Sequence, residues 1–343
     1  MPVSYILSTF ITFVLILLAI AFFTLLERKI LGYIQVRKGP NKVGIMGLPQ
    51  PFADALKLFA KEQAHPSITN YTPFYFAPIL SLVLALLLWA LYPSNTPSFI
   101  LPFGILLFLC ISRLNVYSTL IAGWSSNSKY SLIGALRSIA QTISYEVRMS
   151  LILLTTLMTF NTYNFLTPRF NAKTSPIALL FPIAILWFIT MLAETNRTPF
   201  DLAEGESELV SGFNTEYSSG PFALIFMAEY TRILAIRIFT AALFTSSSFY
   251  FIRDLYFAVK TLIVAVIFIW VRGTLPRIRY DRLIALTWKS FLPAVIASLT
   301  FIVPALALIW CCAGTNGWLW WCQLWGPPPT PRSEACISIG LLT

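Results

Sequence analysis

Charged side chains are scarce in this chain of 343 residues: they make up 11% of it, whereas 57% of the residues are hydrophobic. A water-soluble domain has about 25% charged residues, because its surface must be hydrated. The mean hydropathy of +0.75 agrees with this shortage of charge. The composition excludes an ordinary soluble protein, and the abundance of large apolar residues excludes a disordered one.

Metal-binding side chains are also few. The chain has one histidine and five cysteines, and four of the cysteines lie beyond residue 310 (Cys311, Cys312, Cys322 and Cys336). The sequence has no CxxC pair, which zinc and iron–sulfur centres commonly use. We therefore expect no metal site in the body of the chain.

Long apolar runs dominate instead. A bilayer core about 30 Å thick needs roughly 20 apolar residues per helix. Runs of this kind occur at 4–26, 72–92, 99–121, 131–160, 176–193, 221–245, 255–271 and 289–310. They predict an all-α, polytopic membrane protein with eight transmembrane helices in a single domain over 1–310. Residues 311–343 form an atypical tail with Trp, Cys and Pro, to which we assign no function.

Basic residues are distributed unevenly between the two sides of the predicted bundle. Of the 24 Lys and Arg residues, fourteen fall in the loops that follow the first, third, fifth and seventh runs, and five fall on the other side (Arg169, Lys173, Arg253, Lys260 and Arg332). The positive-inside rule places the basic loops on the inner side and both termini on the outer side. The net charge of +10 therefore reflects membrane topology, and we expect no nucleic-acid partner.

A short amphipathic segment lies in the first basic loop. In residues 51–62, Phe52, Ala55, Leu56, Phe59 and Ala60 recur at helical spacing on one face, with charged residues on another. About 18 Å of helix is too short to cross a bilayer. The pattern predicts an interfacial helix, with a helix packed on other loops as the alternative.

Several ionisable residues fall inside the predicted spans, where they are costly and commonly functional. The fourth run contains Arg137, Glu146 and Arg148, and the sixth contains Glu229 and Arg232, which are spaced to pair. We expect the fourth helix to lie inside the bundle, because it is polar on two faces. The alternative is that these groups form ion pairs that only fix helix register.

Acidic residues gather in one loop. Six of the fourteen acids fall within residues 194–216, on the basic side of the membrane, namely Glu194, Asp201, Glu204, Glu206, Glu208 and Glu216. Crowded carboxylates repel one another and bind protons more tightly, as proton carriers require. A solvated acidic loop is the alternative, although the interleaved Phe200, Leu209 and Phe213 argue against it.

Several stretches resemble one family, the core membrane subunit 1 of respiratory complex I, the NADH:ubiquinone oxidoreductase. They are Glu27-Arg28-Lys29, residues 37–44, Gln50 through Leu58, residues 134–146, the block Ala193 through Tyr230, and residues 272–281. The resemblance covers roughly residues 1–310. A near-continuous block of this length is far more specific than a short motif.

The resemblance implies a subunit of the mitochondrial inner membrane that forms the ubiquinone entry chamber and an acidic funnel for proton translocation. It implies other complex I subunits as partners, and flavin and iron–sulfur clusters only in those partners. The implied coupling acids are Glu146, Glu194, Glu204, Glu206, Glu208 and Glu229. The implied chamber or portal residues are Arg28, Phe52, Asp54 and Phe226, and the basic partners are Arg137, Arg197, Arg272, Arg277 and Arg279.

Two other functions remain open at this point. The chain could be the membrane subunit of an energy-converting hydrogenase, or a cation/proton antiporter subunit. The sequence also departs from the resemblance at Arg113, which lies inside the third run where the family has small or apolar residues. Two alternatives account for Arg113: it pairs with an acid of another helix, or it reflects an error in the sequence.

Overall fold

The structure is a computed structural model that describes residues 2–93, 101–160, 163–165, 177, 180–203, 205, 209–245 and 253–316. Every regular element in these ranges is helical, which confirms the all-α prediction. The tail from residue 317 onward and the acids Glu204, Glu206 and Glu208 lie outside the described residues. The predicted domain boundary at 310 stays a prediction, and the last helix continues to Asn316.

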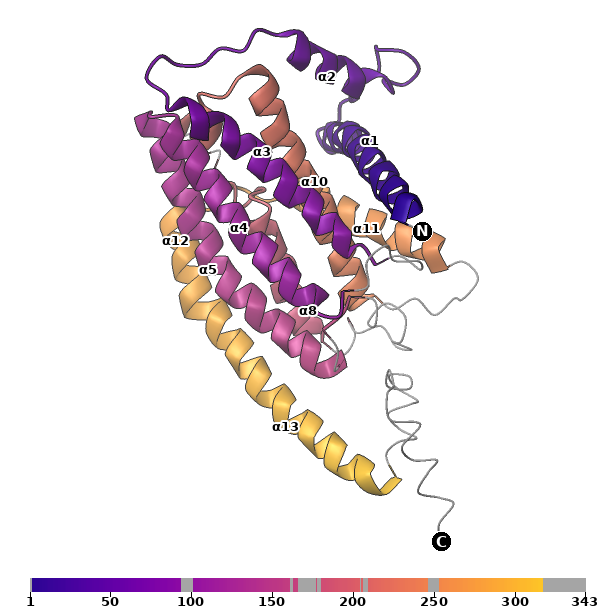
Figure 1. Cartoon of the computed structure of the whole chain (residues 1–343). Helices are drawn as coiled ribbons and strands as arrows, with labels where there is room; N and C mark the ends of the chain where they lie inside the picture. Colours follow the sequence, from indigo (N-terminus) through magenta and orange to yellow (C-terminus); the bar gives the residue numbers. More distant parts are fainter. Residues whose placement is uncertain are drawn as a thin grey trace.

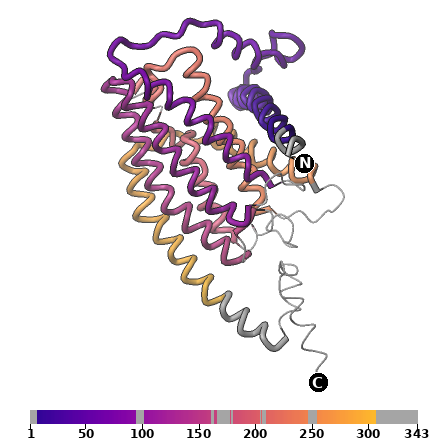
Figure 2. Tube along the Cα trace, viewed as in Figure 1, coloured from indigo at the N-terminus to yellow at the C-terminus, as the bar shows by residue number. Residues whose placement is uncertain are grey.

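The long helices correspond to the apolar runs. They are α1 (Pro2–Ile34), α3 (Tyr71–Leu88), α4 (Gly104–Ser125), α5 (Lys129–Phe160), α10 (Ser219–Phe244), α11 (Arg253–Thr274) and α13 (Leu292–Asn316). The shorter elements are α2 (Gln50–Ala60), α8 (Phe181–Glu194), α12 (Tyr280–Leu286) and the turns η1 (Trp89–Leu91), η2 (Gly212–Asn214) and η3 (Thr287–Phe291). The π-helical turn η3 joins α12 to α13, so that the two form one rod, which Figure 2 traces along one edge.

The helices α3, α4, α5 and α10 form the centre of the bundle (Figure 1). The rod of α12 and α13 packs along α5 on one side, whereas α1 and α11 pack together on the other, against α10. The interfacial helix α2 lies across one end of the molecule and contacts α1 and α10. The fourth apolar run, α5, packs against α4, α8 and the rod, but Leu136, Ile143 and Met158 remain exposed along it. The prediction that this helix lies inside the bundle therefore holds for one side of it only.

The core is built from large apolar side chains of α4, α5, α8 and α10. Trp187 on α8 and Met149 on α5 are almost completely buried. Phe108 of α4 meets Phe239 of α10 edge to face at 5.2 Å between ring centroids. Such pairs stabilise a structure beyond the area they bury, by about 0.5–1.5 kcal/mol each. The core therefore fixes the faces of α5, α8 and α10 that hold the ionisable residues.

Six helices in the described ranges are long and apolar enough to cross a membrane: Leu7–Ile34, Tyr71–Leu91, Gly104–Ser125, Lys129–Phe160, Asp254–Thr274 and Tyr280–Ala305. The predicted count of eight is not confirmed. Helix α8 is described over only 14 residues, and α10 is 26 residues long but carries Glu229, Arg232 and Arg237. These three charged side chains lower the hydropathy of α10, which is not among the six candidate spans.

Large apolar side chains remain exposed on the outer helices. Phe10 on α1 is 64% exposed and Phe301 on α13 is 76% exposed. Exposed apolar faces of this extent are unsuited to water and suit lipid or partner helices. The membrane assignment made from composition is thus supported by which faces the fold leaves uncovered.

Gly134 allows α5 to approach η2 closely. A Cβ added at Gly134 would lie 2.8 Å from the Cα of Gly212, a distance that real Cβ atoms essentially never show. The neighbouring atoms are backbone, so that they cannot move aside cheaply. The contact therefore requires glycine, and it holds the end of the acid-rich loop against α5.

We predict that Gly134→Ala destabilises the subunit by about 1–3 kcal/mol, the usual cost of overpacking. The measurement is the thermal stability of the detergent-solubilised complex that contains the chain. Gly220→Ala is the control, because its Cβ would approach only the flexible side chain of Gln63, at 3.2 Å. Equal stability of the two variants would contradict the role of the close approach.

Candidate functional site

The carboxylate of Glu27 lies at the junction of α1, α10 and α11. Its Oε2 accepts a hydrogen bond of 2.8 Å from the Tyr230 hydroxyl, and its Oε1 forms an ion pair with Arg272 Nη1. Glu27 is only 5% exposed. A buried carboxylate is tolerated when both oxygens have partners of this kind, so that the three residues form one buried polar node.

Two further arginines surround this node. The guanidinium of Arg197 lies 4.6 Å from the centre of the Tyr230 ring, and that of Arg237 lies 4.2 Å from the centre of the Phe23 ring. Both interact electrostatically with residues of the node: Arg197 with Glu27, and Arg237 with Glu27 and Tyr230. The sequence indicates Arg197 and Arg272 as site residues but does not indicate Glu27 or Tyr230. The available signal was that Glu27 is the first charged side chain of the chain and still lies inside α1.

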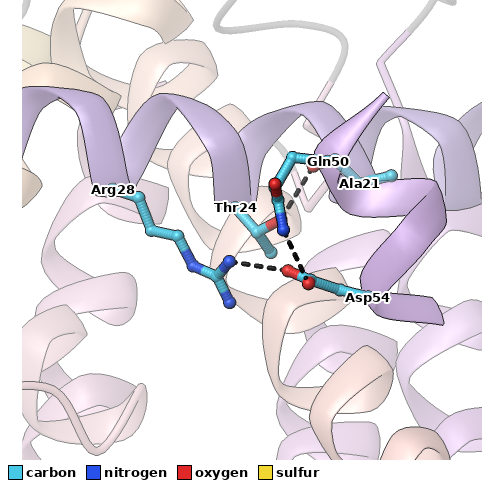
Figure 3. A network of polar contacts seen from close by, with 5 residues as sticks. All are labelled: Ala21, Thr24, Arg28, Gln50 and Asp54. Atoms are coloured by element: carbon cyan, nitrogen blue, oxygen red, sulfur yellow. Dashed lines mark hydrogen bonds and ion pairs between the residues drawn. The ribbon is translucent and has the colours of Figure 1, made fainter. Parts of the chain in front are cut away.

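The helix α2 is attached to α1 through Asp54. Figure 3 shows Arg28 of α1 reaching Asp54, with an Nη1–Oδ2 distance of 2.6 Å. The other carboxylate oxygen of Asp54 accepts a hydrogen bond of 2.9 Å from the amide of Gln50. The pair is partly exposed, so its contribution to stability is modest, but it orients α2. The structure thereby brings together two of the predicted chamber residues, Arg28 and Asp54.

Aromatic side chains continue from this contact on both sides. The ring of Phe52 on α2 meets Phe22 of α1 edge to face at 6.0 Å. On α10, Phe226 stacks with Phe222 at 5.9 Å and lies 4.6 Å from the Tyr230 ring. Phe226 is therefore adjacent to the node of Glu27, whereas Phe52 lies on the half-exposed face of α2. Aromatic side chains of α1, α2 and α10 thus lie around the polar node of Glu27, Tyr230 and Arg272 and the contact of α1 with α2.

Glu146 of α5 pairs with Arg113 of α4, with a distance of 3.6 Å between Arg113 Nε and Glu146 Oε2. This contact agrees with the first of the two alternatives for Arg113, pairing with an acid of another helix. The carboxylate is nearly buried, whereas the Arg113 side chain is 63% exposed. The pair therefore lies at the outer surface of the α4–α5 contact.

Glu194 at the end of α8 and Glu229 on α10 lie deeper in the bundle. Both interact electrostatically with Arg232, and Glu194 also interacts with Glu146. Arg232 in turn donates a hydrogen bond of 2.5 Å from Nη2 to Asn115 Oδ1 on α4. Glu229 and Arg232 influence each other electrostatically, but they form no ion pair within the described residues. Asn115 is a further member of the group that the sequence did not indicate.

A small cavity adjoins these residues, between α3, α4 and α10. Its volume accessible to water is about 20 Å³, and its polar lining is Ser81, Ser118, Thr119, Thr195, Asn196, Glu229 and Arg232. A cavity of this size with several polar groups suits one water molecule. Glu229 and Arg232 therefore face a space that is fit for hydration in an otherwise apolar bundle.

The acid-rich loop, residues 194–216, is anchored to the bundle near both of its ends. Gln141 on α5 donates hydrogen bonds from Nε2 to the carbonyls of Ala193 (3.0 Å) and Phe200 (2.9 Å). The far end of the loop is held by Tyr217, whose ring stacks on Phe74 at 4.2 Å. Burial raises the pKa of Tyr217 to about 12, so that its hydroxyl keeps its proton and donates to the Phe74 carbonyl. These anchors fix both ends of the loop that contains the predicted acids.

The remaining basic residues occupy different positions. Arg277 approaches the acid-rich loop, because a Cβ added at Gly205 would lie 3.2 Å from its Nη2. Arg279 pairs with Asp281 at 3.4 Å on the exposed surface. Arg137 is partly buried on α5. Of the predicted basic partners, Arg197, Arg272 and Arg277 thus lie beside the acids or the acid-rich loop, whereas Arg279 points elsewhere.

The NADH dehydrogenase family profile matches residues 7–303, which is most of the chain. The chain belongs to the NADH dehydrogenase family. It is similar to proteins named NADH-ubiquinone oxidoreductase chain 1: 55% identical to that of Aedes aegypti over 84% of this chain and 91% of the relative. The corresponding values are 50%, 87% and 95% for Locusta migratoria, and 52%, 82% and 90% for Phascolarctos cinereus. All the described site residues lie within the matched range.

In this NADH dehydrogenase family member, Arg272→Met should remove the charged partner of a buried carboxylate. We predict a destabilisation of about 2–4 kcal/mol, somewhat less than for a fully buried pair because Arg272 is partly exposed. The measurement is thermal unfolding of the solubilised complex. Arg279→Met is the control and should cost less than about 1 kcal/mol, because its pair with Asp281 is exposed. The double variant Glu27→Gln with Arg272→Met should recover part of the loss; strict additivity would sink the idea of a coupled node.

Proposed function

We propose that the chain is the membrane subunit of NADH:ubiquinone oxidoreductase that forms the ubiquinone entry chamber and couples quinone reduction to proton translocation. The observation that supports this most directly is the group of buried acids, each beside an arginine, in a chain that is at least half identical to proteins named NADH-ubiquinone oxidoreductase chain 1. Electrons would arrive from flavin and iron–sulfur clusters in partner subunits. The chain's own residues would handle the quinone and the protons.

The coupling acids in this proposal are Glu146, Glu194 and Glu229, together with the loop acids Glu204, Glu206 and Glu208. Reduction of a quinone to a quinol consumes two electrons and two protons, so that the site must gain or relay protons. The interaction of Glu194 with Glu146, and the cavity beside Glu229 that is large enough for one water molecule, support a path from the loop into the bundle. Arg113 near Glu146, and Arg232 near Glu194 and Glu229, would compensate the charge of these three carboxylates when no proton is bound.

The quinone portal in this proposal lies between α1, α2 and α10. An isoprenoid tail needs an apolar lining, which Phe52 and Phe226 offer, and a headgroup needs polar groups further inside. Arg28 and Asp54 would hold α2 over the entrance, as their ion pair supports. The basic residues Arg137, Arg197, Arg272, Arg277 and Arg279 would serve the chamber and the contact with the hydrophilic subunits.

In this proposal α8 and α10 also cross the membrane, which gives eight spans. The chain would lie in the mitochondrial inner membrane with both termini on the intermembrane-space side and the acid-rich loop on the matrix side. The excess of basic residues on the loops of one side supports this orientation. The names of the relatives favour the oxidoreductase over the hydrogenase and antiporter alternatives.

We predict that Glu194→Gln lowers quinone-linked NADH oxidation and proton pumping about tenfold or more, because the amide cannot take up a proton. NADH oxidation with a hydrophilic artificial acceptor should persist, since it bypasses the quinone. Glu62→Gln is the matched control, because Glu62 lies just beyond the end of α2 and is exposed. Unchanged quinone reductase activity in Glu194→Gln would rule out the proposed coupling role. Glu204→Gln should behave in the same way as Glu194→Gln.

We also predict that Phe226→Trp raises the KM for long-tailed quinones several-fold more than the KM for short-tailed ones, because it narrows the portal. Phe52→Trp should have a smaller effect in the same direction, since Phe52 is half-exposed. Phe301→Trp on the outer surface of α13 is the control and should change neither KM. Equal changes for both quinone types would argue against a tunnel wall at Phe226.

A further inference from the structure

Arg113 lies in an unusual place for a charged side chain. It is near the middle of α4, about 14 Å along the helix axis from Gly104 and about 18 Å from Ser125, at 1.5 Å per residue. Helix α4 is one of the candidate membrane spans. A side chain at that depth is too far from either headgroup region for its guanidinium to reach water easily by bending along the helix.

Among the residues that the structure describes, the guanidinium of Arg113 has one ionic partner, Glu146. Its Nε faces Glu146 Oε2 at 3.6 Å, yet the side chain is 63% exposed on the outside of the bundle. The two Nη groups form the remaining edge of a planar fork, which matches the two oxygens of a carboxylate. Bare hydrocarbon offers neither acceptors nor charge to such a group.

The surface around Arg113 is a single helical stripe. We define the α4 outer face as Leu106, Cys110, Arg113, Leu114 and Tyr117, which recur at i, i+4, i+7, i+8 and i+11 and are all exposed. It is apolar except for the guanidinium, the thiol and the hydroxyl of Tyr117. A surface of this kind suits another transmembrane helix with one anionic group at matching depth.

We propose that the α4 outer face seats a transmembrane helix of another subunit of the complex, and that this helix carries a carboxylate that pairs with the Nη edge of Arg113. Arg113 would then lie between two carboxylates, Glu146 on its Nε side and the partner's on the other. The arrangement also has a consequence for coupling, which rests on the proposed function. When Glu146 binds a proton, Arg113 keeps an anionic partner in the membrane. The seat itself depends only on charge complementarity.

Cys110 supplies a direct test, because it lies one helical turn from Arg113 on the same face. In the intact complex, with Cys311, Cys312, Cys322 and Cys336 replaced by Ser, Cys110 is labelled with a benzophenone maleimide and illuminated. Peptide mass spectrometry should find an adduct on a membrane-spanning segment of another subunit, with an Asp or Glu within about one turn of the site. The Cys110→Ser variant, matched in all other respects, should give no adduct.

Two results of this experiment would overturn the proposal. One is an adduct with lipid alone, and the other is a partner segment without an acid near the modified position. Because the labelled chain keeps Arg113, the result does not depend on whether an Arg113 variant assembles.

A charge exchange tests the pairing itself. Arg113→Glu should reduce retention of the partner subunit in the solubilised complex at least fivefold, and replacing the partner's carboxylate with Arg in the same complex should restore it. Arg113→Lys should retain more partner than Arg113→Leu, because it keeps the charge without the fork. Failure of the exchanged pair to restore retention would overturn the proposal. Retention of the partner subunit is measured without turnover. A negative result for the Arg113 pairing is therefore distinguishable from a negative result for the coupling role, which Glu194→Gln tests.

Discussion

The arrangement of the outer helices depends on the buried carboxylate of Glu27, which forms an ion pair with Arg272 and accepts a hydrogen bond from Tyr230. A carboxylate buried in an apolar bundle is stable only with charged or hydrogen-bonding partners, and here they come from α11 and α10. The position of α1 is therefore fixed by polar geometry as well as by apolar packing. One residue further, Arg28 reaches Asp54 and orients α2. A single short stretch of α1 thus determines where the proposed portal lies relative to the core.

A similar constraint operates at α4. This helix supplies Arg113 to Glu146 on α5 and Asn115 to Arg232 on α10. Ionisable groups in a membrane interior must find partners, and in these two contacts the partners come from other helices. The alternative considered from the sequence, that these groups fix helix register, and the functional interpretation are therefore not exclusive. The same contacts that would hold the coupling acids also align the helices around them.

The sequence predicted the elements that follow a simple period. The 3.6-residue pattern of 51–62 is helix α2 to within two residues at each end. Seven of the eight apolar runs correspond to long helices, whereas the run 176–193 corresponds to α8, which is described over 14 residues. For Arg113 the sequence offered pairing with an acid of another helix as one of two alternatives, because an unpaired charge is costly inside a membrane. It did not indicate Tyr230 or Asn115 as partners, since a hydroxyl or amide inside an apolar helix has no distinctive spacing. Which acid meets which base depended on helix packing that periodicity does not specify.

The ionisable residues proposed to carry protons also hold helices together, and this constrains how coupling could work. If a proton binds Glu146, its attraction to Arg113 weakens, and the α4–α5 contact loses part of its polar component. The same reasoning applies to Glu194 and Glu229, whose charge is balanced by Arg232, itself bound to α4 through Asn115. A change of protonation in this bundle therefore alters the forces between helices. Proton transfer and small helix displacements would then be two aspects of one event, because the groups that take up charge are those that set helix positions.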